Sequence, residues 1–124
     1  MLMEEVIIDT SAMLFAVQNK TDVFSLIEEA MPGCQILVST GIMHELERMA
    51  ASRTDNRKYA KSVLAMMEKH KIEAVNDQSY ADEWIVSESG KRGCSVCTND
   101  MALKERLKAA KIRVLSVSWN GILR

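Results

Sequence analysis

The stretch Cys94-Ser95-Val96-Cys97-Thr98-Asn99-Asp100 decides the fold that this sequence predicts. It is an apolar run that ends in a hydroxyl and a carboxylate, and a helical pattern over residues 101–110 begins directly after it. A further apolar run at residues 112–117 completes a strand–helix–strand unit. Such units build their sites at the carboxyl ends of parallel strands, so Asp100 is a candidate site residue. An acid in the first turn of a helix is also favourable against the helix dipole, and this second interpretation stays open.

The rest of the chain alternates in the same way between short apolar runs and helical patterns. Further strands are expected at residues 5–8, 35–38 and 72–75, and helices at residues 12–17, 22–30, 39–50, 54–70 and 79–90, with residues 119–124 as a short tail. The longest helix is expected to bury Tyr59, Val63, Met66 and Met67. This alternation predicts an α/β sandwich around a mostly parallel, five-stranded sheet. A single domain over residues 1–124 suits a chain of this length.

The composition is that of an ordinary folded protein, with 48% hydrophobic and 27% charged residues. A formal net charge of -1 does not by itself indicate nucleic-acid binding, although a protein whose total charge is near zero can still have a basic surface. The N-terminus is acidic, unlike a secretory signal, and the longest apolar run, residues 12–17, is far shorter than the roughly 20 residues of a membrane span. We therefore expect a cytoplasmic protein with no membrane contact. Its three cysteines are expected as reduced thiols, and the pair Cys94 and Cys97 lacks the further ligands of a zinc site.

Four carboxylates fall at or near the carboxyl ends of the expected strands. Asp9 follows the first strand and Asp100 the fourth, while Glu45 and Asp82 lie in the early turns of the helices after the second and third strands. Each has a structural alternative: Asp9 could cap a helix, Asp82 could close a capping box with Ser79, and Glu45 could be a solvated rim residue. If the sheet reverses its strand order beside the first strand, all four carboxylates converge there.

Carboxylates crowded together repel one another, so they either take up protons or hold divalent cations. Ligands that are all oxygen favour Mg²⁺ or Mn²⁺ over Zn²⁺. Basic side chains that could meet an anionic substrate lie around the start of the longest helix, at Arg53, Arg57, Lys58 and Lys61, and one turn into the last helix, at Lys104. Contact with a sugar-phosphate backbone requires such groups, although a cationic helix face is also common where a helix simply meets solvent.

These motifs together resemble the PIN-domain nucleases. The resemblance rests on an Asp at the end of the first strand followed by Thr-Ser, on H-E-L-E-R-M at a helix start, on an Asp that opens a helix, and on T-N-D ahead of L-K-E-R-L-K. It covers residues 6–117 in the order and spacing of the family. The family implies a three-layer α/β fold, a metal-dependent acidic site and endonucleolytic cleavage of RNA, often by a homodimer.

The resemblance also implies a role for each matching residue. It assigns catalysis and metal binding to Asp9, Glu45, Asp82 and Asp100, and the hydroxyls that orient these acids to Ser11 and Thr98. One or two Mg²⁺ or Mn²⁺ ions would activate a water, neutralise the phosphate and stabilise the leaving oxygen during in-line hydrolysis. Asp9 and Asp100 are the expected principal ligands, and the basic residues named above are expected to steer the RNA backbone.

The sequence departs from the family pattern after T-N-D. Many members carry a further acid there, whereas residues 101–104 supply none. The departure suggests one tightly held ion and a second recruited with the substrate. It also supports an alternative function, a PIN-like module of weak or absent activity that binds RNA or protein. The segment L-K-E-R-L-K-A-A-K-I-R-V-L resembles the branch linked to ribosomal RNA processing more than the toxins of toxin–antitoxin pairs. The resemblance therefore implies a ribosome-assembly protein as partner or, in a toxin, an antitoxin.

Other families with similar motifs fit less well. A response-regulator phosphoacceptor domain needs paired acids at the first strand, where Asp9 stands alone, and a haloacid-dehalogenase-like phosphatase needs a second Asp where Ser11 stands. His44-Glu45 is not followed by the second histidine of a zinc protease. Gly90-Lys91-Arg92-Gly93 has neither the spacing nor the following Lys-Ser/Thr of a phosphate-binding loop.

Overall fold

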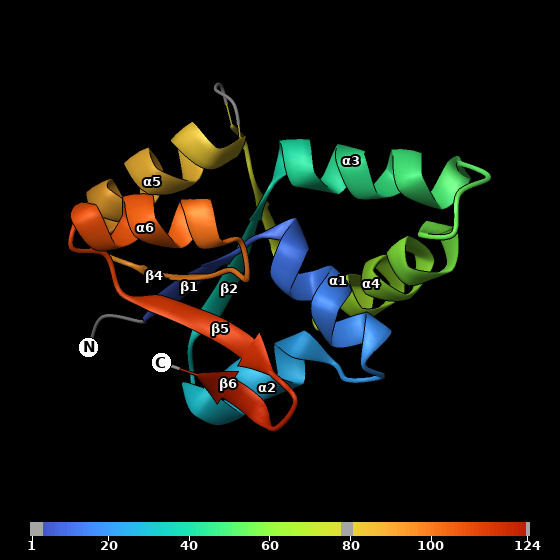
Figure 1. The fold of residues 1–124 in the computed structure, drawn as a ribbon, viewed down its shortest axis with the longest axis horizontal. Coiled ribbons are helices and arrows are strands. Elements are labelled where there is room, and N and C mark those ends of the chain that lie inside the picture. Colours follow the sequence, from blue (N-terminus) through green and yellow to red (C-terminus); the bar gives the residue numbers. More distant parts are fainter. Residues whose placement is uncertain (1–3, 78–80, 124) are drawn as a thin grey trace.

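Strands and helices alternate along the chain in the computed structural model, which describes residues 4–77 and 81–123 (Figure 1). The elements are β1 (Glu5–Ile8), α1 (Thr10–Gln18), α2 (Val23–Ala30), β2 (Gln35–Ser39), α3 (Thr40–Ala51), α4 (Arg57–Lys69), β3 (Glu73–Val75), α5 (Ala81–Arg92), β4 (Ser95–Cys97), α6 (Met101–Ala109), β5 (Val114–Ser118) and β6 (Gly121–Leu123). The predicted α/β class is confirmed. Within the described residues, none of the helices combines the length and the apolar character needed to cross a membrane.

The strands form one sheet in the order β3-β2-β1-β4-β5-β6. The first five are parallel; Ile7 in β1, for example, lies opposite Leu37 in β2 on one side and opposite Val96 in β4 on the other. From β1 the chain first builds outward through β2 and β3 and then, on the other side, through β4 and β5. The reversal of strand order beside β1, on which the expected convergence of the acids depends, is therefore present, and it marks the place where doubly wound sheets build their sites.

A sixth strand corrects the predicted count of five. The segment predicted as a short tail turns at Trp119-Asn120 and returns as β6, antiparallel to β5, with Ser118 opposite Gly121. Gly121 has φ +124°, a conformation that favours glycine. The Ser118 hydroxyl donates a hydrogen bond to the Gly121 carbonyl oxygen (3.0 Å) and accepts one from the Asn120 N–H (3.2 Å), which closes the hairpin.

Helices cover both faces of this sheet. Figure 1 shows α5 and α6 together on one side, with α1, α3 and α4 on the other. Covered on both faces, the central strand β1 buries Val6, Ile7 and Ile8 completely. On the helices, Leu103 and Leu107 of α6 are also completely buried. The three layers thus place the core on either side of β1, and the carboxyl edge of the sheet is left for polar residues.

The helix α4 begins later than predicted, and its buried side agrees with the prediction at Val63 and Met67 only. Residues 52–56 form the turn from α3, in which the Ser52 hydroxyl donates to the Met49 carbonyl oxygen (2.7 Å), so the helix begins at Arg57 rather than Thr54. Its buried residues are Ala60, Val63 and Met67. Tyr59 and Met66, predicted as buried, are only partly covered. The small Ala60 fits beneath the neighbouring helices where the larger Tyr59 ring was expected.

The helix α5 extends two residues beyond its predicted end. It continues through Gly90 to Arg92 and stops before Gly93, which has φ +66° and so terminates the helix in the left-handed conformation. Arg92 forms ion pairs with Glu88 on the same helix (3.1 Å) and Glu5 in β1 (3.0 Å). The capping box predicted between Ser79 and Asp82 involves a residue outside the described part of the chain.

Candidate active site

Four helices begin around one point at the carboxyl edge of the sheet. Figure 1 shows the N-terminal ends of α1, α3, α5 and α6 facing one another there, above the ends of β1 and β4. The predicted site residues Asp9, Glu45, Asp82 and Asp100 belong to these four helix starts or early turns. Helix N-termini carry partial positive charge, so this edge is favourable for acidic side chains and for anions.

Asp9 is held by two hydroxyls rather than by its own helix. It occupies the N-cap position of α1, yet its side chain accepts no capping hydrogen bond. Its Oδ2 instead accepts hydrogen bonds from the Ser11 hydroxyl (2.7 Å) and the Thr98 hydroxyl (2.8 Å), and the residue is only 9% exposed. The interpretation of Asp9 as a simple helix cap is therefore wrong. Its Oδ1 accepts no hydrogen bond from the described residues.

The same two hydroxyls also fix the loop that leads to Asp100. Thr98, which is fully buried, accepts a hydrogen bond from the Asp100 N–H (3.1 Å), and Ser11 accepts one from the Asn99 N–H (3.0 Å). Each hydroxyl thus uses its proton for Asp9 and its oxygen for the loop. Two segments 89 residues apart in sequence, at Asp9 and Thr98, are joined in one network.

Asp100 both caps a helix and faces the site. Sequence analysis placed it in the first turn of the last helix; it is the N-cap of α6, and its Oδ1 accepts a hydrogen bond from the Leu103 N–H (3.0 Å). Its structural alternative, an acid in a favourable position against the helix dipole, therefore also holds. Capping uses one carboxylate oxygen, and within residues 4–77 and 81–123 the other accepts no hydrogen bond. Asp100 can cap the helix through one oxygen while the other faces a ligand.

Asp82 lies within electrostatic reach of both Asp9 and Asp100. It is partly covered in the first turn of α5, while the neighbouring Glu83 is exposed, as predicted. Burial and then the negative charges of Asp9 and Asp100 raise the pKa of the Asp82 carboxyl, and the opposing influence of Arg106 is smaller. The structure therefore brings three of the four predicted acids together.

Glu45 is not joined to the other three acids by any described contact. The helical pattern predicts Glu45 at the edge of the apolar side of its helix and Glu47 away from it. Both side chains are exposed on α3, so their burial does not differ as the pattern suggested. The charges that raise the pKa of Asp82 do not include that of Glu45. A role for Glu45 in the site stays a prediction.

The predicted basic residues fall into two separate places. Lys104 is half-buried on α6, and its positive charge opposes the burial and the Asp9 charge that together raise the pKa of the Cys97 thiol to about 12. Arg53, Arg57, Lys58 and Lys61 are exposed at the far end of α3 and the start of α4. Because α3 has 12 residues, this group lies about 18 Å along the helix from the edge that holds the acids. Of the five predicted basic residues, only Lys104 is near the carboxylates.

Asn99 supports the site in a way that sequence analysis missed. Its side-chain amide donates to the Val117 carbonyl oxygen (3.0 Å) and accepts from the Val117 N–H (2.9 Å), so it pairs with β5 as a backbone segment would. The Ser116 hydroxyl adds a bond to the Thr98 carbonyl oxygen (3.2 Å). These bonds fasten the loop between Thr98 and Asp100 to β5. No local pattern could reveal this role, because the partner lies 18 residues further along the chain.

Asp77 is a second supporting residue outside the predicted set. Its Oδ1 accepts from the Thr40 hydroxyl (2.9 Å) and from the Gly41 N–H (3.1 Å), and thereby binds the first turn of α3 to the end of β3. A Cβ at Gly41 would lie 2.6 Å from the Asp77 Oδ2. The glycine in this turn, otherwise unfavourable in a helix, is the sequence feature that could have indicated the close approach.

The three acids provide a donor set suited to a divalent cation. Carboxylate oxygens are the ligands that Mg²⁺ and Mn²⁺ prefer, and a cation would relieve the repulsion that raises the pKa of Asp82. Throughout residues 4–77 and 81–123, no three Asp, Glu, His or Cys side chains already lie close enough to form a complete ligand cluster. The acids therefore fit a hard cation chemically and would have to draw closer around it.

The fold and the site together define a class: a doubly wound α/β protein whose acidic residues meet at the reversal of strand order beside β1. Comparison with known proteins identifies the family within this class. A family model described as a PIN-like domain matches residues 6–118, so this chain belongs to the PIN-like domain family. The resemblance drawn from the sequence motifs is confirmed.

Two relatives are 28% identical to this chain over the aligned residues. The ribonuclease VapC9 of Archaeoglobus fulgidus aligns over 108 residues, which are 87% of this chain and 78% of the relative. The solved structure of the PIN domain endonuclease Utp24 superimposes with a TM-score of 0.78 over 95% of this chain and 88% of its own. The predicted three-layer fold is therefore confirmed.

More distant solved structures share the fold alone. A domain of a functionally unknown protein from Methanocaldococcus jannaschii has a TM-score of 0.66 at 15% identity, over 93% of this chain and 91% of that domain. VapBC2 from Rickettsia felis, solved with a DNA fragment from its promoter, has a TM-score of 0.64 at 13% identity, over 90% of this chain and 98% of that chain. The sheet and its flanking helices are thus retained even where few residues are shared.

Proposed function

We propose that this chain is a metal-dependent endoribonuclease that hydrolyses RNA phosphodiester bonds at the site of Asp9, Glu45, Asp82 and Asp100. The observation that carries the proposal is the hydrogen-bond network in which Thr98 joins the Asp9 carboxylate to the backbone of Asp100, with Asp82 in the first turn of α5 at the same edge of the sheet. A ribonuclease and an endonuclease at 28% identity support the choice of reaction.

Each residue of the site has a distinct part in this proposal. Asp9 and Asp100 would be the principal ligands of one or two Mg²⁺ or Mn²⁺ ions, with Asp82 and Glu45 completing the set. When bound, the metal would supply an activated water and neutralise charge on the phosphate. Ser11 and Thr98 hold one oxygen of Asp9, which leaves the other oriented for a ligand. Thr98 also accepts a hydrogen bond from the Asp100 N–H, so one hydroxyl links the two principal ligands.

The proposal includes the partners implied by the family. We extend it to self-association as a homodimer in the cytoplasm, and to a ribosome-assembly protein or an antitoxin as the partner protein. The two relatives at 28% identity are a ribonuclease named VapC9 and the endonuclease Utp24, so their shared support is for the nuclease reaction rather than for one of the two pathways.

Circular RNA provides the test of this function, because a circle has no ends and only an internal cut can open it. A pool of circular RNAs with a randomised segment is incubated with the purified chain in EDTA, Mg²⁺ or Mn²⁺, and linear products are separated by gel electrophoresis. We expect linear products with Mg²⁺ or Mn²⁺ and none in EDTA. Circles that stay closed under all three conditions would contradict the proposal, and equal cutting in EDTA would contradict the metal dependence.

A further inference from the structure

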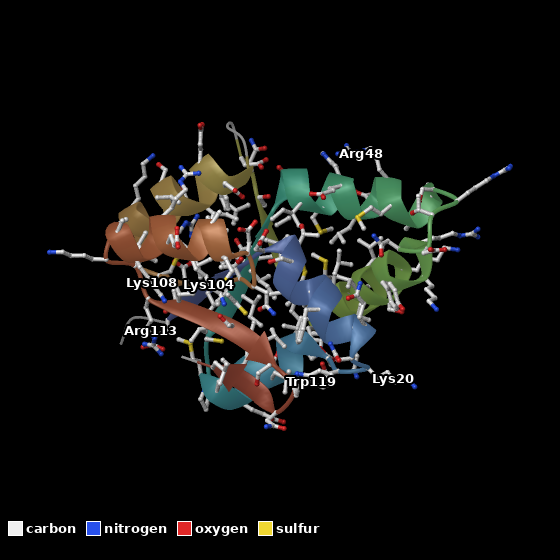
Figure 2. All side chains as sticks on the ribbon, viewed as in Figure 1. Lys20, Arg48, Lys104, Lys108, Arg113 and Trp119 are labelled. Atoms are coloured by element: carbon white, nitrogen blue, oxygen red, sulfur yellow. The ribbon has the colours of Figure 1, made fainter. Side chains whose placement is uncertain are left out.

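A row of positive side chains runs along one flank of α6 towards the start of β5. It consists of Lys104, Lys108 and Arg113, and we refer to it as the α6 cationic row. Lys104 and Lys108 are four residues apart, so they lie on the same face of the helix, about 6 Å apart along its axis. Figure 2 shows all three residues on the side of the molecule where α6 and the beginning of β5 lie. The three positive side chains therefore belong to the same part of the molecule (Figure 2).

Acidic residues do not neutralise the α6 cationic row. Among the described residues, ion pairs within 4.0 Å involve only His70 and Arg92, so the three side chains of the row have no such partner. Glu105 lies about 100° further round the helix from Lys104. At the far end of the row, Arg113 itself lines a surface hollow together with Glu4 and Glu5, although neither carboxylate forms an ion pair with it in the described structure. The positive charge of the row is thus available to an anion and has a defined end.

The stability of the helix does not explain why Lys104 is there. A positive charge in the last turn, as at Lys108, is favourable against the helix dipole, whereas one in the first turn is unfavourable. Lys104 belongs to that first turn and is half-buried. A favourable i, i+4 pair with Asp100 would account for it, but no ion pair within 4.0 Å joins the two in the described structure. The position of Lys104 therefore suggests a use other than holding the helix.

The row starts beside the acids. Lys104 lies in α6, which follows β4 along the chain, and β4 pairs with β1, the strand that directly precedes Asp9. Asp100 precedes Lys104 by one helical turn. The group at Arg53, Arg57, Lys58 and Lys61 lies instead beyond the far end of α3. An RNA strand positioned for cleavage at the acids would reach the α6 row first.

We propose that the α6 cationic row binds the RNA backbone on one side of the cleavage site, and that the basic group at the start of α4 does not. This inference rests on the function proposed above and adds the path of the substrate. Each of the three side chains would meet a phosphate, because Lys and Arg contact phosphates without reading bases. Binding through the row is therefore expected to be independent of sequence.

The test compares two triple variants that remove the same charge. One is Lys104→Gln, Lys108→Gln and Arg113→Gln, and the matched control is Arg57→Gln, Lys58→Gln and Lys61→Gln. Binding of a fluorescent single-stranded oligouridylate is measured by anisotropy in EDTA at several salt concentrations, so the result does not depend on cleavage. Circular dichroism and thermal unfolding establish that both variants are folded.

The row variant is expected to bind RNA about tenfold more weakly. Its slope of log affinity against log salt should fall by about 2, since a single strand contributes about 0.7 for each phosphate contact. The control variant should bind within about twofold of the wild type. Equal loss in both variants, or loss in the control alone, would overturn the inference while leaving the cleavage proposal intact.

Two further outcomes distinguish this inference from the cleavage proposal and from the binding of an acidic protein. A wild type that binds oligouridylate through the row but never opens circular RNA would refute the nuclease and retain the binding surface. Polyglutamate of matched charge is the second probe. If it binds as tightly as oligouridylate and both depend on the row, the surface is a contact for acidic protein, and the assignment to RNA is overturned.

Discussion

Asp100→Asn is expected to lower kcat/KM for RNA cleavage at least about 100-fold while leaving the fold nearly unchanged. Removing a charged metal ligand forfeits several kcal/mol of stabilisation in the reaction, and each 1.36 kcal/mol is a factor of ten. Asparagine is as good an N-cap as aspartate, so it can still accept the Leu103 N–H through its amide oxygen. The free energy of unfolding should therefore change by less than about 1 kcal/mol. The measurements are single-turnover cleavage and urea unfolding.

Glu105→Gln is the matched control for this variant. It removes the same charge from the same helix at an exposed position, so it should cleave RNA at close to the wild-type rate. If Asp100→Asn cleaved as fast as Glu105→Gln, Asp100 would be only a helix cap. A large loss of stability in Asp100→Asn would show instead that its charge is needed for folding.

Thr98→Val is expected to reduce the free energy of unfolding by about 3 kcal/mol. The Thr98 hydroxyl is fully buried, donates to Asp9 and accepts from the Asp100 N–H. Valine has nearly the same shape but leaves both groups without this partner, and a buried group deprived of its hydrogen bond costs about 1–3 kcal/mol. Equilibrium unfolding in urea measures the change.

Thr98→Ser separates the hydroxyl from the methyl group. Serine keeps the hydroxyl and loses one buried methyl group, so it should cost only about 1 kcal/mol. Cleavage should follow the same order, with Thr98→Ser closer to the wild type than Thr98→Val. If Thr98→Ser were less stable than Thr98→Val, packing of the methyl group rather than the hydrogen-bond network would stabilise this part of the site.

Features carried by local pattern could be predicted from the sequence. The central strand β1 agrees with its predicted range. A short run of β-branched residues is typical of a strand that is covered on both faces. The position of Asp100 at the start of the last helix followed from the βαβ pattern, and the reversal of strand order beside β1, which the sequence offered only as a condition, is present in the structure. Once that order was known, Asp9 and Asp100 had to meet, since β1 and β4 are neighbours.

Features that depend on distant partners could not be predicted. The strand β6 has three residues and gains its stability from pairing with β5, so its sequence carries too little pattern. Asn99 and Asp77 act through Val117 and Gly41, which the fold brings to them. The group around Arg57 looked equivalent to Lys104 in the sequence. Their separation became visible only when α3 was placed between them.

The central claim is that Asp9, Asp82 and Asp100 form a divalent-cation site, and thermal unfolding with and without Mn²⁺ tests it most directly. A ligand at about 100 times its dissociation constant stabilises the folded state by about 2.7 kcal/mol, and no RNA substrate is needed. We predict that millimolar Mn²⁺ raises the unfolding temperature of the wild type and that this gain shrinks in Asp9→Asn. The metal-free variant should be at least as stable as the wild type, because one repelling charge is gone. An unfolding temperature that Mn²⁺ does not change, or raises equally in both proteins, would contradict the claim.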